Sequence, residues 1–291
     1  MKKNIVKAIA ATLVATACVG CFAACQDNSG DDTPALKVIE IELTQEEYAF
    51  AVNKNNTTLL EQANTYLAEI KSNGAFDAVV NKWFGEGAAP VGYPIGTYDA
   101  DKDQLVVLTN TPFEPFEYTG SDGKYYGVDI ELMAGFADYL DKELCIIEHL
   151  DFDTICEEAN KYTNGVVAAG LTVSADRAEV VNFTNSYYSA SQKLIVAGTD
   201  TKFDACQTAK DVEDILKTFD TSVNIGYQNG TTGALYVNGD AEWGFDGFNV
   251  TKSGYRTAAL AAQALVNGNI QYVVVDSAPA NAIVKAINAM N

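Results

Sequence analysis

Apolar runs and amphipathic stretches alternate along the chain from residue 104 onward. Strand-like runs are short and continuously apolar, as in QLVVLTN (104–110), whereas helix-like stretches repeat their apolar residues every three or four positions, as in YYGVDIELMAGFADYLD (125–141). The alternation forms one block up to about residue 198 and a second block from about residue 200. We therefore expect two α/β lobes, each with a largely parallel sheet covered by helices. Ligands of such sheets bind beyond the carboxyl ends of the strands, so two facing lobes predict a cleft.

The first third of the chain has a different pattern. LKVIEIEL (36–43) alternates apolar and charged residues and predicts a half-buried strand, and YAFAVNK (48–54) predicts another. A helix follows, with a threonine cap before it and Gly74 after it, and a shorter helix covers 76–84. Residues 85–103 carry Gly, Pro and Asp without periodicity, so they predict a linker.

Residues 1–24 have the composition of a signal peptide, with a basic start, an apolar run and small residues before Cys25. FAAC (22–25) resembles a bacterial lipobox, which predicts lipidation of Cys25 and a membrane anchor; ordinary cleavage and secretion is the alternative. The polar segment 25–35 predicts a flexible tether. No later segment is long and apolar enough to span a bilayer. We expect the protein on the extracellular face of the bacterial cytoplasmic membrane or in the periplasm.

The charge of the chain argues against several partners. The net charge is −20, and removal of Lys2, Lys3 and Lys7 with the leader gives −20 − 3 = −23. Such an acidic protein is not expected to bind nucleic acid or anionic lipid headgroups.

The three cysteines that follow Cys25 and the single histidine argue against a metal or catalytic centre. Cys145, Cys156 and Cys206 are odd in number and lack metal-like spacing, and His149 is the only histidine. A His-based zinc site or a Ser-His-Asp triad is therefore not expected, and no cofactor is predicted. Burial as small apolar side chains is favoured over a disulfide.

Arg177 is the first candidate binding residue. It lies in GLTVSADR (170–177), where a strand ends and Ser174 can cap the next helix. A cation in the first turn of a helix opposes the helix dipole, so stability alone would not select it. Its planar guanidinium can hold a carboxylate with two parallel hydrogen bonds. A surface arginine without a binding role is the alternative.

Two further strand ends carry groups that could hold a charged ligand. GYQNGTTG (226–233) runs from a strand through a glycine turn into a helix, so the backbone N–H groups and hydroxyls of Thr231 and Thr232 predict an anion site. It lacks the lysine of a phosphate loop, which argues against nucleotides. Asp276 ends an apolar strand and could either receive an ammonium group or cap the following helix.

Two aromatic residues follow successive strands where loops at a cleft are expected. Phe113 lies in TNTPFEPFEY (109–118) and Phe152 in LDFDT (150–154). Each could form a wall of a binding site, and burial in the core is the alternative for each.

Together these stretches resemble the family-3 extracellular solute-binding proteins, the receptors of ABC importers for polar amino acids, and most closely their glutamine-binding branch. The resemblance rests on NTPFEPFEY, DGKYYGVDIELM, LDFDTI, AAGLTVSADRAEVVNFTNSYY, GYQNGTTG and the strand-end Asp276. It implies an α/β, two-lobe periplasmic-binding-protein-like (Venus flytrap) fold.

The resemblance also implies a role for each candidate residue. Arg177 would hold the α-carboxylate of the ligand, and Asp276 its α-ammonium. A zwitterion that leaves water needs both charges paired, and pairing from opposite lobes couples binding to closure. The remaining contacts would come from the Gly170 carbonyl, the Thr172 hydroxyl, donors on Thr231 and Thr232, and the rings of Phe113 and Phe152.

Residues 46–85 resemble the end of these family members, yet they precede the part that resembles their beginning. We interpret the chain as circularly permuted; a duplicated element without permutation is the alternative. Lobe 2 then comprises 36–43 and 199–291, and LKVIEIEL adds a strand to its sheet. Lobe 1 covers 44–198, with a permuted element at 44–86, a linker at 87–103 and a core at 104–198.

Departures from the family pattern limit the ligand. Asn110 stands where receptors for basic amino acids commonly carry an acid, and Gln228 stands where the glutamine branch has a lysine. The side-chain end of the pocket thus lacks an obvious counter-charge, which predicts a neutral amino acid, polar or small. Glu114 or Glu117 would overturn this prediction if either pointed into the pocket.

The expected partners are a free amino acid and the permease of an ABC transporter, bound by a monomeric receptor that is not an enzyme. One alternative is a ligand-sensing protein that reports to a signalling partner. The other is a cyclohexadienyl-dehydratase-like enzyme on the same fold, with Glu114 as the candidate catalytic carboxylate.

Overall fold

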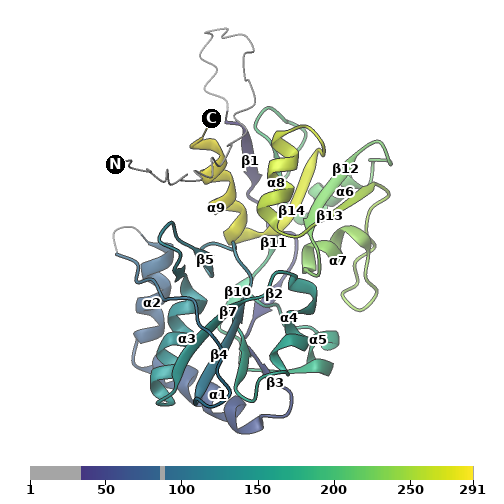
Figure 1. The fold of residues 1–291 in the computed structure, drawn as a ribbon. Coiled ribbons are helices and arrows are strands. Elements are labelled where there is room, and N and C mark those ends of the chain that lie inside the picture. Colours follow the sequence, from purple (N-terminus) through teal and green to yellow (C-terminus); the bar gives the residue numbers. More distant parts are fainter. Residues whose placement is uncertain (1–33, 86–88, 291) are drawn as a thin grey trace, which may run out of the picture. The chain divides into compact units, whose positions relative to one another are not determined.

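The computed structural model describes residues 34–85 and 89–290 of the 291-residue chain. Two five-stranded sheets with their helices make up most of this part (Figure 1). The predicted signal peptide, Cys25 and nearly all of the predicted tether lie outside the described residues. Within the described residues, no helix is long and apolar enough to cross a membrane.

The first lobe contains five strands in one sheet, several helices and a small hairpin. The sheet strands are β3 (Ala51–Asn53), β4 (Gln104–Thr109), β7 (Glu143–Glu148), β8 (Gly165–Val167) and β9 (Val181–Phe183). The other elements are α1 (Thr57–Ser72), α2 (Ala75–Phe84), the hairpin β5 (Tyr118–Thr119) and β6 (Tyr125–Tyr126), α3 (Val128–Tyr139), the 3-10 turn η1 (Phe152–Thr154), α4 (Ile155–Ala159) and α5 (Ala175–Val180). The strand order is β7-β4-β8-β3-β9, in which β3 runs antiparallel to both of its neighbours.

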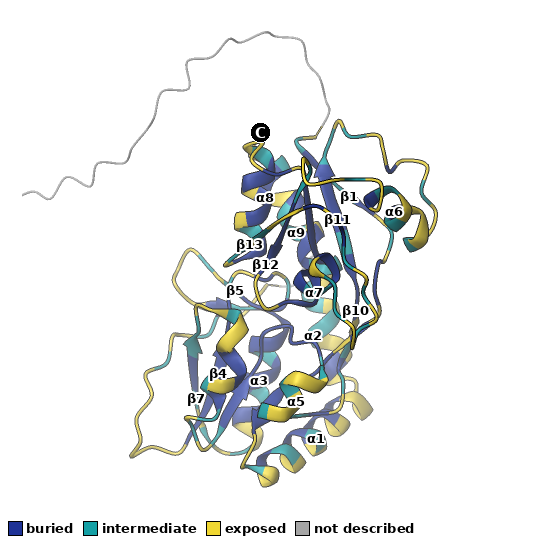
Figure 2. Ribbon diagram, turned by 90° about the vertical axis from the view of Figure 1, so that its right-hand side faces the viewer, coloured by how far each residue is buried: buried dark blue, intermediate teal, exposed yellow. Residues whose placement is uncertain are grey.

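Helices cover both faces of this first sheet. Along β4, Leu105 and Val107 face the core formed with α1 and α3, and Leu108 belongs to the core on the opposite face with α4. This two-residue alternation follows from the pleat of a strand. Figure 2 shows β4 in dark blue, while yellow exposed residues lie along α1 and α5. Burial on both faces explains why the strand reads as a continuous apolar run.

The second lobe contains a second five-stranded sheet. Its strands are β1 (Leu36–Ile39), β11 (Gln192–Ala197), β12 (Asn224–Gln228), β13 (Thr251–Tyr255) and β14 (Tyr272–Asp276). Its helices are α6 (Ala209–Leu216), α7 (Thr232–Asn238), α8 (Ala258–Val266) and α9 (Ser277–Asn288). The strand order is β1-β11-β14-β12-β13. Because β1 pairs with β11 from Leu36 to Ile39, the prediction that this segment adds a strand to the second sheet is confirmed.

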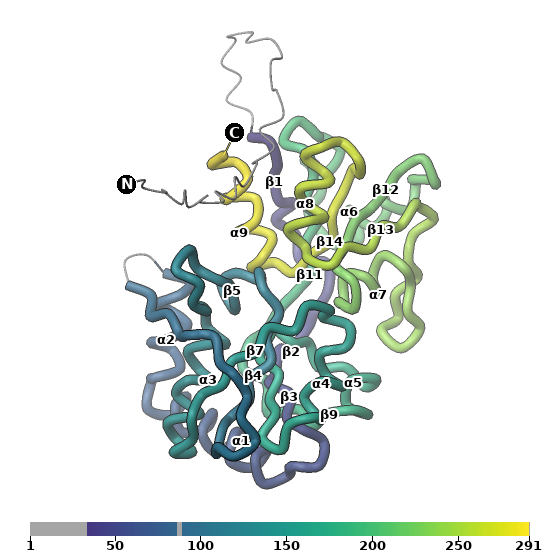
Figure 3. Tube along the Cα trace, in the orientation of Figure 1, coloured from purple at the N-terminus to yellow at the C-terminus, as the bar shows by residue number. Residues whose placement is uncertain are grey.

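The chain passes between the two sheets at two places. It leaves β1, forms the short strand β2 (Glu46–Tyr48) against β10 (Tyr188–Ala190), and later returns from β10 into β11 (Figure 3). The two crossings are tied together, since the Gln192 amide N–H donates to the Thr44 hydroxyl at 2.9 Å. The crossing strands therefore form the connection about which the lobes could move.

Three details of the fold differ from the sequence prediction. The sheets are mixed rather than largely parallel, because β3, β1 and β11 run antiparallel to their partners. Residues 192–197, predicted in lobe 1, belong to the second sheet, since β11 lies between β1 and β14. Only Ser191 separates β10 from β11, and no glycine or proline marks a loop between the two strands, which hid the boundary. Asn56 caps α1 in place of the predicted threonine, by accepting the Leu59 N–H.

The three cysteines of the described region have free thiols. Cys145 and Cys156 are buried, as predicted, whereas Cys206 is partly exposed. Burial raises the pKa of the Cys156 thiol to about 11, so this group stays a thiol at neutral pH.

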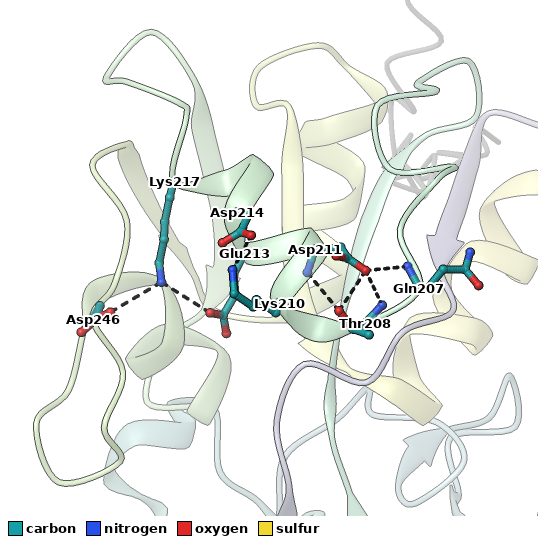
Figure 4. Close-up of polar contacts among 8 residues, drawn as sticks. All are labelled: Gln207, Thr208, Lys210, Asp211, Glu213, Asp214, Lys217 and Asp246. Carbon is teal, nitrogen blue, oxygen red and sulfur yellow. Dashed lines mark hydrogen bonds and ion pairs between the residues drawn. The ribbon is translucent and has the colours of Figure 1, made fainter.

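A polar cluster on α6 has a structural explanation (Figure 4). The Thr208 hydroxyl and the Asp211 carboxylate form a capping box at the start of the helix. Near its end, Lys217 lies 3.5 Å from Glu213 and 3.5 Å from Asp246. Exposed pairs of this kind contribute about 0–1 kcal/mol each. The cluster thus stabilises the helix ends.

Candidate ligand-binding site

A cavity between the two sheets is lined by all ten residues predicted for ligand binding. These are Asn110, Phe113, Phe152, Gly170, Thr172, Arg177, Gln228, Thr231, Thr232 and Asp276. Glu117 and Ala169 complete the lining, and the cavity volume is about 10 Å³, so the two lobes enclose little free space in this conformation. The structure brings these side chains together, and their roles in binding remain a prediction.

The positions follow from the ends of the strands. Asn110 follows β4, Gly170 lies beyond β8, Gln228 ends β12 and Asp276 ends β14. Each of these strands points its carboxyl end toward the other lobe, where polar groups converge as expected for open α/β sheets.

Gly170 has a conformation and a close neighbour that both require glycine. Its φ is +51°, and a Cβ placed there would lie 2.5 Å from a ring carbon of Phe113. The absence of a side chain thus lets the Phe113 ring pack directly on the backbone that lines the cavity.

Arg177 reaches from the first lobe to the second. Its backbone N–H donates to the Ser174 side chain, which caps α5 as predicted. Its guanidinium donates to the Thr172 carbonyl at 2.6 Å and to the Gly230 carbonyl of the second lobe at 2.8 Å. The Phe152 ring lies 5.2 Å from the guanidinium carbon, within cation–π range. Burial lowers the pKa of Arg177 from its usual value, but a guanidinium remains charged in proteins.

Asp276 occupies the N-cap position of α9, yet its side chain does not cap that helix. Instead, its Oδ1 accepts a hydrogen bond of 2.5 Å from the Tyr48 hydroxyl of β2. The residue is 5 % exposed. Burial, and then the nearby Glu46, raise the pKa of Asp276 to about 7. The helix-capping alternative is therefore not what holds this carboxylate in place.

Glu46 supports the cavity from behind, and the sequence analysis did not identify it. Its Oε2 accepts from the Thr172 hydroxyl at 2.9 Å, and its Oε1 accepts from the Thr44 hydroxyl at 2.6 Å and from the Gln192 amide at 3.0 Å. Because the Thr172 hydroxyl donates its only proton to Glu46, it offers the cavity lone pairs alone. Thr172 is therefore suited to an ammonium group and not to a carboxylate. The available signal was the two-residue spacing that puts Glu46 on the buried face of β2 with Tyr48.

Asn110 and Gln228 meet across the cavity. The Gln228 Nε2 donates to the Asn110 Oδ1 at 3.0 Å, and the Asn110 Nδ2 donates to the His149 carbonyl at 2.7 Å. The Gln228 Oε1 accepts the Ala258 N–H at 3.2 Å. Both amides are thus engaged within the protein, and this end of the cavity carries no net charge.

Thr231 and Thr232 begin α7. The Thr231 hydroxyl donates to the Gln228 carbonyl at 2.8 Å and accepts the Ala234 N–H as the helix cap. The hydroxyl proton of Thr231 is therefore engaged within the protein in this structure, and the role of Thr231 and Thr232 in binding stays a prediction.

One further acid lines the cavity, and a second contacts the backbone that lines it. Glu117 is fully buried, lines the cavity, and has no hydrogen-bond partner for either carboxyl oxygen among the described residues. Burial, and then Asp129 and Asp276, raise its pKa well above the usual range. Asp129 accepts the Gly170 N–H at 2.9 Å and the Tyr187 hydroxyl at 2.7 Å. Glu114 is exposed and lies outside this cavity.

Within residues 34–85 and 89–290, no group of three His, Cys, Asp or Glu side chains is placed so that it could hold a metal ion.

Comparisons with known proteins give a consistent result. Residues 105–238 match the model of the bacterial extracellular solute-binding proteins, family 3. A probable histidine-binding protein of Neisseria gonorrhoeae is 26% identical over 193 residues, which are 66% of this chain and 63% of that protein. The match thus spans less than two thirds of the length of that relative. A structure described as an ancestral arginine-binding protein bound to glutamine shares 28% identity at a TM-score of 0.52 and covers 64% of this chain and 74% of its own.

The fold also matches an ancestral amino-acid-binding protein described as a precursor of cyclohexadienyl dehydratase. That structure is 24% identical, covers 63% of this chain and 74% of its own, and has a TM-score of 0.54. It establishes the two-lobe periplasmic-binding-protein-like fold.

Proposed function

Because this chain is a family-3 extracellular solute-binding protein, we propose that its cavity binds a free amino acid, which closure of the two lobes delivers to an ABC importer. Arg177 would hold the α-carboxylate, and Asp276 the α-ammonium. The observation that carries this proposal is that a guanidinium of the first lobe and a carboxylate of the second line the same small cavity.

The charges of the cavity suit a zwitterion. A buried carboxylate or ammonium without a partner is costly, and each end of an amino acid would meet the opposite charge here. Because the two partners come from different lobes, only the closed arrangement pairs both ends, which would couple binding to closure.

The side-chain end of the cavity supports a neutral ligand. Asn110 and Gln228 supply only amides, and these are already bonded to each other. We propose a neutral amino acid, polar or small, as the first candidate.

A cationic amino acid is the second candidate, because an acidic side chain lies in the cavity, which is the observation that would overturn the prediction of a neutral ligand. Glu117 lines the cavity, and its carboxyl group would pair either with a cationic side chain or with the α-ammonium of a neutral ligand. A relative named for histidine binding and a structure named for arginine binding support this candidate, and the latter structure is bound to glutamine.

Calorimetric titration of the protein with each of the twenty amino acids tests the proposal and separates the candidates. Tight binding of a neutral amino acid supports the first, and binding of lysine, arginine or histidine alone supports the second. The absence of binding by any of them would overturn the amino-acid proposal.

We further propose that the chain is circularly permuted, with lipidated Cys25 as the membrane anchor of a monomeric receptor. The permutation is supported by β3 and α1, which precede β4 in sequence yet complete the first lobe. Of the alternatives, a sensory role would need a separate signalling partner. The enzyme alternative loses support, because its candidate Glu114 lies outside the cavity.

A further inference from the structure

Glu117 differs from the other acids around the cavity. Asp276, Asp129 and Glu46 each accept at least one hydrogen bond from the protein. Glu117 is 0% exposed, and neither of its oxygens has a partner among the described residues. A buried carboxyl group without donors is costly, so an unbonded one that lines a cavity indicates a partner that enters the cavity.

The position of Glu117 indicates which part of a ligand it would meet. The charged groups that act on it are Asp129 and Asp276, and Asp129 in turn holds the backbone N–H of Gly170. Glu117 therefore lies at the Asp276 and Gly170 end of the cavity. Thr172, at the same end, offers only lone pairs.

We propose that Glu117 accepts a hydrogen bond from the α-ammonium group of the ligand, so that two carboxyl groups recognise that ammonium. This inference rests on the proposed function. A primary ammonium has three N–H donors, which would be shared by Asp276, Glu117 and the lone pairs of Gly170 and Thr172. The protein would thereby select an ammonium group over a neutral hydroxyl at the same position.

Proton balance follows from the surroundings of Glu117. Asp276, Asp129 and the Tyr187 hydroxyl face this group, and no cation among the described residues bonds to it. These surroundings favour the neutral form of the Glu117 carboxyl group before binding. When the ammonium arrives, the Glu117 proton leaves to solvent, and the resulting carboxylate pairs with the ammonium.

Calorimetric titration of the wild type and Glu117→Gln tests this role. The probes are L-glutamine, L-histidine and L-arginine, each paired with the 2-hydroxy acid of the same side chain. Because a hydrogen bond to a charged group contributes roughly 10- to 100-fold in affinity, Glu117→Gln should weaken amino-acid binding by that factor. Binding of the hydroxy acid should change less than about threefold, since the interaction with the ammonium is absent from it.

Glu114→Gln is the matched control, because it removes the same charge from an exposed neighbour outside the cavity. It should leave both affinities unchanged. Equal losses for amino acid and hydroxy acid in Glu117→Gln, or no loss at all, would overturn the role of Glu117 and leave the proposed function standing. If the wild type bound no amino acid, both would fall. Should Glu117→Gln not fold, Glu117→Asp provides the same comparison with a shorter acid.

Discussion

The Tyr48 hydroxyl donates a 2.5 Å hydrogen bond to the Asp276 carboxylate, and so joins β2 to the end of β14 in the second lobe. This bond uses Oδ1 of Asp276, which lines the cavity. It also fixes the direction of the carboxylate, because Tyr48 is fully buried and cannot turn away.

Removal of this hydroxyl should weaken the proposed binding without unfolding the protein. Tyr48→Phe keeps the ring but takes a donor from a buried carboxylate, which costs about 1–3 kcal/mol, or roughly 5- to 150-fold in affinity. Calorimetric titration with the amino acid that binds best measures the loss. Tyr98→Phe removes a hydroxyl from a ring that is 42% exposed and should have no effect. Unchanged affinity in Tyr48→Phe would show that Asp276 needs no orienting partner.

Arg177→Ala should remove most of the affinity. The substitution would leave a ligand carboxylate buried without its charge partner, at a cost of about 3–5 kcal/mol, or roughly two to four orders of magnitude in Kd. The protein should remain folded, because Arg177 lies outside the hydrophobic core clusters, and the melting temperature checks this. Arg256→Ala is the control, because Arg256 is the other arginine of the chain and is exposed. Retained micromolar binding by Arg177→Ala would count against the assigned site.

The stability of the ligand-free protein should fall as the pH rises from about 4 to about 7. The pKa of Asp129 is raised to about 7 in the folded protein, against about 3.9 in an unfolded chain, so the folded state holds a proton that the unfolded state has lost. The stabilising contribution is complete below about pH 4 and is lost as the pH passes through about 7. Urea unfolding between pH 4 and pH 8 measures the change. Asp129→Asn should flatten the profile, and an equally steep profile would exclude Asp129 as its source.

Ligand affinity should change with pH in the opposite direction. The pKa of Asp276 is also raised to about 7, and only its ionised form can pair with an ammonium group. Affinity should therefore increase between pH 5 and pH 8, where the α-ammonium keeps its charge. Titrations at several pH values in buffers of constant ionic strength test this, and a flat profile would contradict it.

A rearranged chain should fold as the original does. Leu36 and Asn288 are hydrogen-bonded to each other, with the Leu36 N–H donating to the Asn288 Oδ1 at 3.0 Å. A short linker from residue 290 to residue 34, with the chain opened at 86–88, should give the same melting temperature within a few degrees and the same affinity. The same chain opened inside α1 is the control and should be much less stable. Failure of the first rearrangement to fold would contradict the permutation.

The sequence was most informative where a polar residue follows an apolar run and so shows where a strand ends. Asn110, Gln228 and Asp276 each follow an apolar run, and the carboxyl ends of such strands converge by the geometry of the fold. Glu46 and Glu117 could not be placed in this way. The two-residue spacing puts Glu46 on the same face as Tyr48. The sequence does not reveal whether the side chain of either acid faces a cavity or solvent, because that depends on strand register and on neighbours distant in sequence. The antiparallel position of β3 between β8 and β9 could not be predicted either, because it depends on pairing with strands that are distant in sequence.

The hydrogen bond between the side-chain amides of Gln228 and Asn110 links the two lobes without a ligand atom. This hydrogen bond therefore stabilises the closed conformation by the same free energy whichever ligand is bound. Such a contact shifts the equilibrium between the open and closed conformations. It would therefore change the apparent affinity for all ligands by the same factor. The affinity of the cavity could thus be adjusted at the Gln228–Asn110 hydrogen bond without a change in the charged groups of Arg177 and Asp276.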